Sequence, residues 1–163
     1  MDSHNQKTQI NIGAGAMRLE GWLSLGLEVG HDVQCDVRKL PFDDDSVDAA
    51  MAIHVLEHIQ RWEARDTLVE WRRVLKPGAK LAIELPELSR CCRNVLDNPD
   101  ARYGVWGLFG DPSYKNELMT HKWCWGESEL VKELRAVGFK VKVARPIWHG
   151  KKSNRDIRVE CLK

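Results

Sequence analysis

The chain has 163 residues, of which 43% are hydrophobic and 30% charged, with a formal net charge of +1. This length suits a single domain with its own core, and the balanced charge argues against sequence-specific nucleic-acid binding. No apolar run approaches the roughly 20 residues of a membrane span, and residues 1–6 lack the apolar core of a signal peptide. We expect one cytoplasmic domain over residues 1–163, with residues 1–7 disordered.

The cysteines and the charge pattern limit the remaining possibilities. The five cysteines form no Cys-x-x-Cys pair and are odd in number, so we expect free thiols and no metal site. Residues 1–57 hold ten acidic and four basic side chains, whereas residues 140–163 hold eight basic and two acidic ones. A solvated basic hairpin and a surface for an anionic acceptor or partner both explain this asymmetry.

The first ordered segment is a strand that breaks into a glycine turn. Thr8–Ile12 is typical of a buried strand, and Gly13-Ala14-Gly15 follows it directly. Glycine allows positive φ and close approach of a ligand to the backbone, and such a turn holds nucleotide-type cofactors at the edge of parallel sheets. An ordinary strand-to-loop turn also explains the pattern, because Arg18 stands where the dinucleotide fingerprint has its third glycine.

The rest of the chain alternates between strand and helix patterns. Further strands are predicted at residues 22–27, 32–37, 47–53, 80–85, 139–143 and 157–161. Helices are predicted at residues 61–75, 87–96 and 127–137, the first ended by Lys76-Pro77-Gly78. The last two strands are expected to form an antiparallel pair. This order predicts an α/β fold: a doubly wound, Rossmann-like, mostly parallel sheet with an antiparallel C-terminal edge strand.

Residues 97–125 are the least regular part of the sequence. They combine three glycines with six aromatic residues. A segment this long without regular structure is usually functional or disordered, and the aromatic content favours function. We interpret it as the site of the acceptor or as a lid.

Several short motifs follow one another in a fixed order. They are Ile12-Gly-Ala-Gly15, Gly21-Trp22, Cys35-Asp-Val-Arg-Lys-Leu-Pro-Phe42, Asp48, His54-Val-Leu-Glu-His58, Arg73-Val-Leu-Lys-Pro-Gly78 and Ala136-Val-Gly-Phe139. The series resembles the class I S-adenosylmethionine-dependent methyltransferases, in particular small members with a His-Val-Leu-Glu-His segment after the fourth strand. The resemblance is close over residues 9–86 and looser through the last helix and hairpin.

The resemblance implies a binding site for S-adenosylmethionine, whose product is S-adenosylhomocysteine. The turn Gly13-Ala14-Gly15 would pack against the ribose and the amino-acid end. Asp36 would accept a hydrogen bond from the adenine amino group, and the Val37 N–H would meet a ring nitrogen. Asp36 as a turn-capping residue is the alternative interpretation.

Two further residues complete the implied site. Leu40 would offer an apolar face to the purine, and His54 would line the methionine end. For His54, a plain position at the start of a helix explains the sequence equally well. We expect packing or surface roles for Glu57 and His58.

One position departs from the family pattern. The family usually has a carboxylate at the end of the second strand, where it holds both ribose hydroxyls. In register with Gly21-Trp22 that position is Gly26. Glu28 lies two residues later and points the same way along a strand, so it is the expected substitute. Without a substitute, the affinity for the cofactor would fall about ten- to a hundred-fold.

The implied reaction is an in-line displacement at the sulfonium methyl group. It needs mainly alignment and exclusion of water, with a base only when the acceptor has a proton to lose. Candidates for that role are His121 and Tyr114, with His149 as a third. Trp123 and Trp125 either wall an acceptor pocket or pack on the sheet.

Two other functions remain open at this stage. One is a non-catalytic or degenerate methyltransferase-fold module that acts through a protein partner. The other is a different enzyme on the same scaffold, such as a nicotinamide dehydrogenase. For an active methyltransferase, we expect a small-molecule acceptor, with an anionic one mildly favoured. The open pocket would be closed by residues 97–125, by a second copy or by a partner chain.

Overall fold

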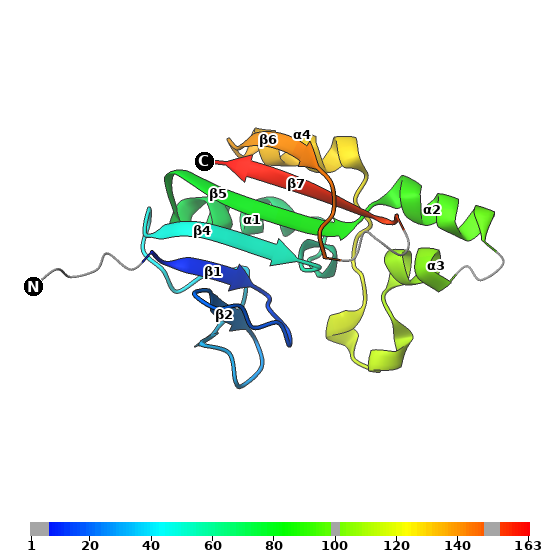
Figure 1. The fold of residues 1–163 in the computed structure, drawn as a ribbon, viewed down its shortest axis with the longest axis horizontal. Coiled ribbons are helices and arrows are strands. Elements are labelled where there is room, and N and C mark those ends of the chain that lie inside the picture. Colours follow the sequence, from blue (N-terminus) through cyan, green and yellow to red (C-terminus); the bar gives the residue numbers. More distant parts are fainter. Residues whose placement is uncertain (1–6, 99–101, 149–153) are drawn as a thin grey trace, which may run out of the picture.

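The computed structural model describes residues 7–98, 102–148 and 154–163. The expectation of disorder for residues 1–7 therefore falls almost entirely outside the described residues. Strands in this part of the chain form a single seven-stranded sheet in the order β3-β2-β1-β4-β5-β7-β6 (Figure 1). The strands are β1 (Gln9–Ile12), β2 (Leu23–Gly26), β3 (Val33–Gln34), β4 (Val47–Ile53), β5 (Leu75–Pro86), β6 (Lys140–Ala144) and β7 (Asp156–Leu162).

The strand directions place the carboxyl ends of the parallel strands together along one end of the sheet, called here the carboxyl edge. β1 pairs in parallel with β2 and β4, β2 with β3, and β4 with β5. β7 is antiparallel to both β5 and β6. The predicted Rossmann-like, mostly parallel sheet with an antiparallel pair at one edge is confirmed, and within that pair the C-terminal strand is the inner member. In parallel sheets ligands bind beside the carboxyl ends of the strands, so this edge is where a site is expected.

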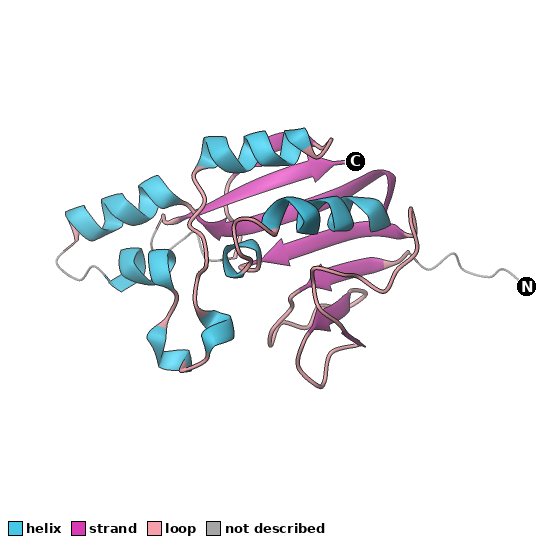
Figure 2. Cartoon of the chain, turned by 180° about the vertical axis from the view of Figure 1, so that it is seen from behind, coloured by secondary structure: helices cyan, strands magenta, loops and turns pink. Residues whose placement is uncertain are grey.

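The helices cover the sheet from one side. α1 (Ala64–Val74) and α4 (Glu127–Ala136) lie against the same face of the sheet, as the view from behind shows (Figure 2). Within the described residues no helix lies over the opposite face, which Figure 1 turns toward the viewer. The connections from β1 to β2 and from β2 to β3 are too short for crossover helices. In the described residues, helices of the expected doubly wound arrangement therefore cover only one face of the sheet.

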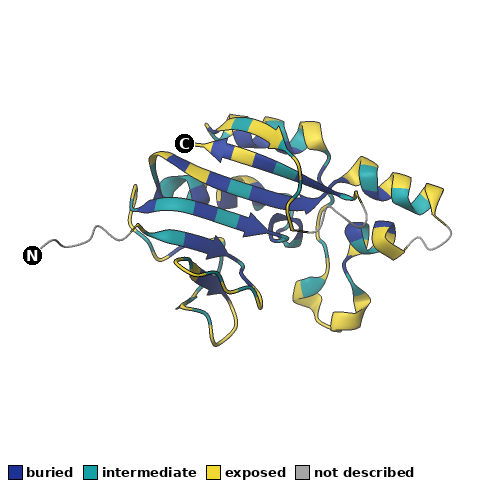
Figure 3. Cartoon of the chain, viewed as in Figure 1, coloured by how far each residue is buried: buried dark blue, intermediate teal, exposed yellow. Residues whose placement is uncertain are grey.

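The main core lies between the sheet and these two helices. Burial is greatest along the central strands and on the inner sides of α1 and α4 (Figure 3). Leu68, Trp71 and Val74 of α1 are fully buried, while Val69 on the other side of the helix is half exposed. This spacing of apolar residues, three or four apart, explains why the segment is helical and which side it buries.

Some predicted boundaries were wrong. α1 begins at Ala64 because residues 61–63 form a turn, in which Glu63 N–H donates to the Gln60 carbonyl. β5 begins at Leu75, directly after α1, and includes the Lys76-Pro77-Gly78 stretch that was predicted to be only a helix stop. The β4–β5 register shifts between Val47 and Ala49, and proline is tolerated at such irregular positions.

The region between β5 and α4 is more regular than predicted. α2 (Leu88–Asp97) matches the predicted helix closely. The segment 97–125, expected to be irregular, contains α3 (Arg102–Phe109) and two short 3-10 helices, η2 (Pro112–Tyr114) and η3 (Glu117–Met119). A third such helix, η1 (Leu56–His58), follows β4. These elements gather beyond the carboxyl ends of the central strands (Figure 1).

Candidate cofactor site at the carboxyl edge of the sheet

The glycine turn after β1 is fixed by its neighbours. Gly13 and Gly15 have φ values of 63° and 51°, in the left-handed region. A Cβ at Gly13 would lie 2.7 Å from Val55 Cγ2, whereas one at Gly15 would meet nothing within 4 Å. Ala14 N–H donates to the Leu25 carbonyl at 2.9 Å, which ties the turn to β2. The turn is thus closed on the Val55 side and open at Gly15, where bare backbone faces outward.

Asp36, predicted to meet adenine, is held by Arg38. Arg38 Nε and Nη2 donate to the two Asp36 carboxylate oxygens at 3.0 and 2.7 Å, and Arg38 N–H donates to Oδ1 at 2.9 Å. These hydrogen bonds, against a smaller effect of burial, lower the pKa of Asp36. The turn-capping interpretation is therefore realised, and the carboxylate keeps spare acceptor capacity at the edge of the sheet.

The backbone beside Asp36 is anchored from beneath. The Trp71 indole Nε1 donates to the Val37 carbonyl at 2.8 Å, so α1 fixes the position of the Val37 peptide. Leu40 is only 3% exposed and belongs to the core. Its N–H donates to Glu70 Oε1 at 2.8 Å. This burial favours a packing role for the Leu40 side chain over contact with a purine.

At Gly26, the end of β2, another side chain occupies the space of the missing carboxylate. A Cβ at Gly26 would lie 2.4 Å from His31 Nε2 and 2.9 Å from His31 Cε1. His31 Nδ1 is buried and has no hydrogen-bond partner among the described residues. Glu28, the predicted substitute, is exposed. Sequence reasoning missed His31 because it precedes β3 and reaches Gly26 only through the fold.

His54, predicted to line the methionine end, uses both ring nitrogens within the protein. Nδ1 lies 2.9 Å from Glu57 Oε1 and Nε2 lies 3.3 Å from Asp156 Oδ2. Glu57 and Asp156 are buried, with 1% and 0% of the side chain exposed. Burial alone would lower the pKa of His54, but the two carboxylates outweigh it and raise the pKa to about 10. His54, whose side chain is 19% exposed, is consequently an imidazolium between two buried carboxylates, and Glu57 has an ionic role that the sequence did not reveal.

The backbone at this point is also unusual. His54 has φ of 55°, a left-handed conformation uncommon for a residue other than glycine or asparagine. Its N–H donates to the Glu84 carbonyl at 2.8 Å. The Glu84 carboxylate accepts from the N–H groups of Ile147 and Trp148 at 2.8 and 2.9 Å. The end of β4 and the segment after β6 are thereby joined through Glu84.

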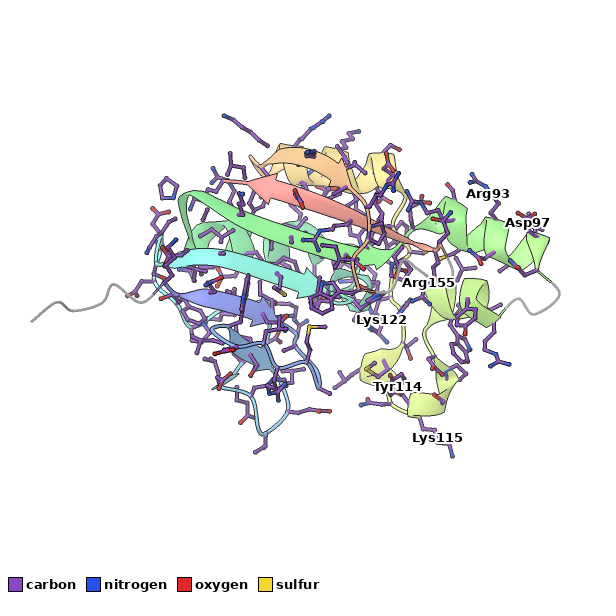
Figure 4. The ribbon with its side chains drawn as sticks, viewed as in Figure 1. Arg93, Asp97, Tyr114, Lys115, Lys122 and Arg155 are labelled. Carbon is purple, nitrogen blue, oxygen red and sulfur yellow. The ribbon has the colours of Figure 1, made fainter. Side chains whose placement is uncertain are left out.

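The three predicted catalytic candidates do not form one group. His121 is half-buried, and its Nδ1 lies 2.9 Å from the Gly107 carbonyl oxygen. Tyr114 is 61% exposed and lies on the part of the segment that extends away from the sheet (Figure 4). His149 lies outside the described residues. Lys122, next to His121, lies beside the carboxyl ends of the central strands in the same view.

The two tryptophans after His121 have different environments. Trp125 is fully buried, so it packs in the core. Trp123 is 39% exposed, and its Nε1 donates to Glu129 Oε2 at 3.1 Å. The Arg61 guanidinium lies 5.0 Å from the Trp125 ring centroid and 5.9 Å from that of Trp123. Of the pair, Trp123 alone remains available to line an acceptor site.

Two other expectations and one hollow concern parts of the structure away from this edge. The five cysteines are free thiols. Every helix in the described part of the chain is too short or too polar to cross a membrane. A hollow bordered by Thr8, Trp22 and Asp32 lies at the amino ends of β1 and β2, the opposite edge from the glycine turn.

Comparisons with known proteins find similarity to methyltransferases. Residues 12–83 match a family model described as a methyltransferase domain. The chain is 33% identical over 127 residues to 2-phytyl-1,4-naphtoquinone methyltransferase of Nostoc punctiforme, an alignment that covers 72% of this chain and 53% of that protein. The chain spans about half or less of the curated relatives it matches, 53% of one and 21% of another.

Solved structures show the same fold. A SAM-dependent methyltransferase from Methanosarcina mazei aligns over 97% of this chain and 93% of its own, with a TM-score of 0.67 and 18% identity. A Burkholderia thailandensis 1,6-didemethyltoxoflavin-N1-methyltransferase, solved with S-adenosylhomocysteine, aligns over 96% and 70%, with a TM-score of 0.63 and 16% identity. At these identities the likeness concerns the fold.

Proposed function

We propose that this chain, in which residues 12–83 match a methyltransferase-domain family model, transfers the methyl group of S-adenosylmethionine to an apolar small-molecule acceptor. The observation that carries the proposal is the glycine turn at the carboxyl edge, closed by Val55 and open at Gly15. That turn, the Asp36 carboxylate and the Val37 peptide follow β1 and β3 at the same edge of the sheet. This arrangement fits a ligand that combines an amino acid, a ribose and a purine.

The residues divide the work of binding. The backbone of Gly13, Ala14 and Gly15 would hold the amino-acid end and one side of the ribose. Asp36 and the Val37 N–H would bind the edge of adenine, since a carboxylate accepts from an amino group and an N–H donates to a ring nitrogen. S-adenosylmethionine supplies a reactive sulfonium methyl group, so the protein has mainly to align it and exclude water.

His31 and Glu28 are the two candidates for the ribose hydroxyls. His31 occupies the space in which a carboxylate at position 26 would lie, and Nε2 is the ring atom nearest to the Cβ of such a residue. Glu28 is exposed in the loop after β2. A ring placed at the end of the strand is better oriented than a loop carboxylate, and we therefore assign the ribose contact to His31, with Glu28 as an outer contact.

His54 would shape the methionine end through its backbone. Both of its ring nitrogens face carboxylates. Its left-handed backbone turns the chain sharply from β4 into η1. The peptide after β4 would therefore contact the cofactor, while the imidazolium fixes the conformation of that peptide.

An apolar acceptor is favoured by the segment from α3 to η3. Phe109, Tyr114 and Leu118 are 67%, 61% and 55% exposed beyond the carboxyl edge. The curated relative acts on a naphthoquinone, as its name states. The basic C-terminal region gives less support to an anionic acceptor, because Arg155, Arg158 and Lys163 pair with carboxylates.

The cofactor assignment is tested by calorimetric titration with S-adenosylhomocysteine. We expect micromolar binding, and a loss of about ten- to a hundred-fold for Asp36→Ala, the range for a hydrogen bond to a charged group. Asp66→Ala, an exposed carboxylate on α1, is the matched control and should bind as the parent does. Circular dichroism checks that Asp36→Ala remains folded. No binding at millimolar ligand would refute the methyltransferase assignment.

The ribose assignment has its own test. His31→Ala should weaken S-adenosylhomocysteine binding roughly 3- to 10-fold, as expected for one neutral hydrogen bond. An analogue without the 2′-hydroxyl and 3′-hydroxyl groups should bind the parent and His31→Ala equally. Gly26→Asp alone should clash with the ring, whereas the double variant His31→Gly with Gly26→Asp should regain affinity. Equal binding of S-adenosylhomocysteine by His31→Ala would refute the ribose contact, and tighter binding would show that the ring blocks the site.

A further inference from the structure

Three side chains with metal-binding atoms meet beside the end of β4. Glu57, His58 and His121 each offer one such atom, and these atoms lie within 4.8 Å of one another. The two imidazole rings meet edge to face, with centroids 4.8 Å apart. Glu57 and His58 belong to η1, whereas His121 follows η3. The group therefore joins the end of a central strand to the candidate acceptor segment.

The backbone holds these two parts together. The Glu57 carbonyl accepts from Lys122 N–H at 2.7 Å and from Trp123 N–H at 3.2 Å. His121 N–H donates to the Phe109 carbonyl at 3.2 Å. The position of His121 relative to η1 is thus set by main-chain contacts and does not depend on the side chains of the group.

In each of the two histidines, one ring nitrogen lies within hydrogen-bond distance of a backbone carbonyl oxygen. His58 Nδ1 lies 3.2 Å from the Thr120 carbonyl, and His121 Nδ1 lies 2.9 Å from the Gly107 carbonyl. A carbonyl oxygen only accepts hydrogen bonds, so Nδ1 is the donor in each ring, which leaves Nε2 as the atom that can act as a ligand. Histidine ligands of metals are commonly oriented by such a contact.

The third member has a carboxylate oxygen with no partner. Glu57 is 1% exposed. Its Oε1 faces His54 Nδ1 at 2.9 Å. Its Oε2 is buried and has no hydrogen-bond partner among the described residues. A buried carboxylate oxygen normally has a partner, because leaving it unpaired is costly. Glu57 Oε2 therefore belongs to the same side chain that lies beside His58 and His121 in the group.

We propose that Glu57, His58 and His121 bind a divalent transition-metal ion, with zinc the best match. Two imidazole nitrogens and one carboxylate oxygen are a known ligand set for zinc sites that keep an open position. In the tetrahedral arrangement that zinc prefers, bonds of about 2.0–2.2 Å place two ligand atoms roughly 3.3–3.6 Å apart. The three atoms of the group lie within 4.8 Å of one another, so side-chain rotations that shorten these separations by roughly 1 Å would bring them onto one ion.

The ion has a defined place in the proposed reaction. Three protein ligands leave at least one position for water or for an oxygen of the acceptor, and this part of the inference rests on the methyltransferase function proposed above. An acceptor hydroxyl bound to the ion would ionise more readily, because the positive charge stabilises the oxyanion. His121 then acts as a ligand of the ion and not as a free base.

The sequence analysis expected no metal site because it relied on cysteine spacing. Glu57 and His58 are adjacent in the sequence, and His121 lies far along the chain. This arrangement has no spacing signature, so the group becomes visible only when η1 and residue 121 are placed side by side.

The test uses the purified full chain after treatment with a chelator, titrated with zinc chloride in competition with a chromogenic chelator. We expect one zinc equivalent per chain, and at least a tenfold loss of affinity in His58→Ala, His121→Ala and Glu57→Gln. Glu117→Gln, an exposed carboxylate on η3, should bind zinc as the parent does. Binding unchanged in both histidine variants, or no stoichiometric binding by the parent, would overturn the proposal.

Two further measurements secure the interpretation. With cobalt in place of zinc, the parent should show visible d–d bands without a sulfur charge-transfer band, since no cysteine is a ligand; a strong sulfur band would contradict the ligand set. If His121→Ala does not fold, His121→Gln is used for the same titration. Titrating metal-free protein with S-adenosylhomocysteine separates the two proposals, because loss of the metal site leaves cofactor binding intact, and absent cofactor binding leaves zinc binding intact.

Discussion

Replacing His54 with asparagine is expected to lower the free energy of unfolding by about 3–5 kcal/mol, the cost of removing one partner from a buried ionic group. Glu57 and Asp156 are 1% and 0% exposed, and His54 is the cation between them. Asparagine tolerates the left-handed backbone at this position, so the variant tests the charge and not the conformation. Urea unfolding with a chelator present measures the effect, which corresponds to roughly 6–20 °C in Tm.

A double-mutant cycle shows whether the loss comes from the unpaired carboxylates. Asp156→Asn combined with His54→Asn should cost clearly less than the sum of the two single substitutions, because the double variant buries one carboxylate fewer without a cation. Arg155, which lies 2.8 Å from Asp156, is unchanged throughout. Additive effects would mean that His54 and Asp156 are not coupled. A loss below about 1 kcal/mol for His54→Asn would mean that the group contributes little to stability.

Trp71→Ala is expected to be as destabilising, at about 3–5 kcal/mol, because it removes a large, fully buried side chain and leaves a cavity between α1 and the sheet. Trp71→Phe keeps most of the packing but removes the indole N–H that donates to the Val37 carbonyl. This variant should cost about 1–3 kcal/mol, since a buried acceptor loses its partner. It should also weaken S-adenosylhomocysteine binding, because the Val37 peptide is no longer fixed.

Trp62 provides the control for these substitutions. It lies just before α1 and is 76% exposed, so Trp62→Ala should change the free energy of unfolding by no more than about 0.5 kcal/mol. The distinguishing result is the cofactor affinity at a temperature where all variants are folded. If Trp71→Phe binds S-adenosylhomocysteine as the parent does, α1 supports the core without positioning the Val37 peptide.

The arrangement of the fold was predictable where the pattern is local. The spacing of apolar residues predicts which side chains are buried in β1, β4 and α1. The turn after β1 is predicted by Gly13 and Gly15. The start of β5 was not predictable, since Lys76-Pro77-Gly78 normally ends regular structure. There the sheet accepts the stretch because Gly78 N–H donates to the Lys163 carbonyl at 3.1 Å, a contact made far from it in the sequence.

The helix α3 shows why glycine misled the prediction. A Cβ at Gly104 would lie 2.6 Å from the Cys91 carbonyl, and one at Gly107 would lie 2.4 Å from Cys91 Sγ. These glycines allow α3 to pack closely against α2, and they do not break the helix. From sequence alone a glycine that permits close packing has the same signature as one that ends a helix.

The candidate site divides in the same way. Asp36 and the Gly13–Gly15 turn could be located from motif order, and the contacts of Asp36 with Arg38 are local. The contact of His54 with Asp156 could not be located from the sequence, because Asp156 belongs to the last strand. His31 was equally hidden, since a histidine in a loop gives no sign that its ring lies against Gly26.

The place of β7 determines how this protein can fold. β7 lies between β5 and β6, and it pairs residue 80 and residue 140 with residue 162. Until it arrives, β5 presents a long unpaired edge, which is a template for pairing with another chain. Because such non-local pairing is slow to form, the nascent sheet remains open to aggregation over that interval. Refolding yield should therefore depend on protein concentration more steeply than the stability of the finished sheet would indicate.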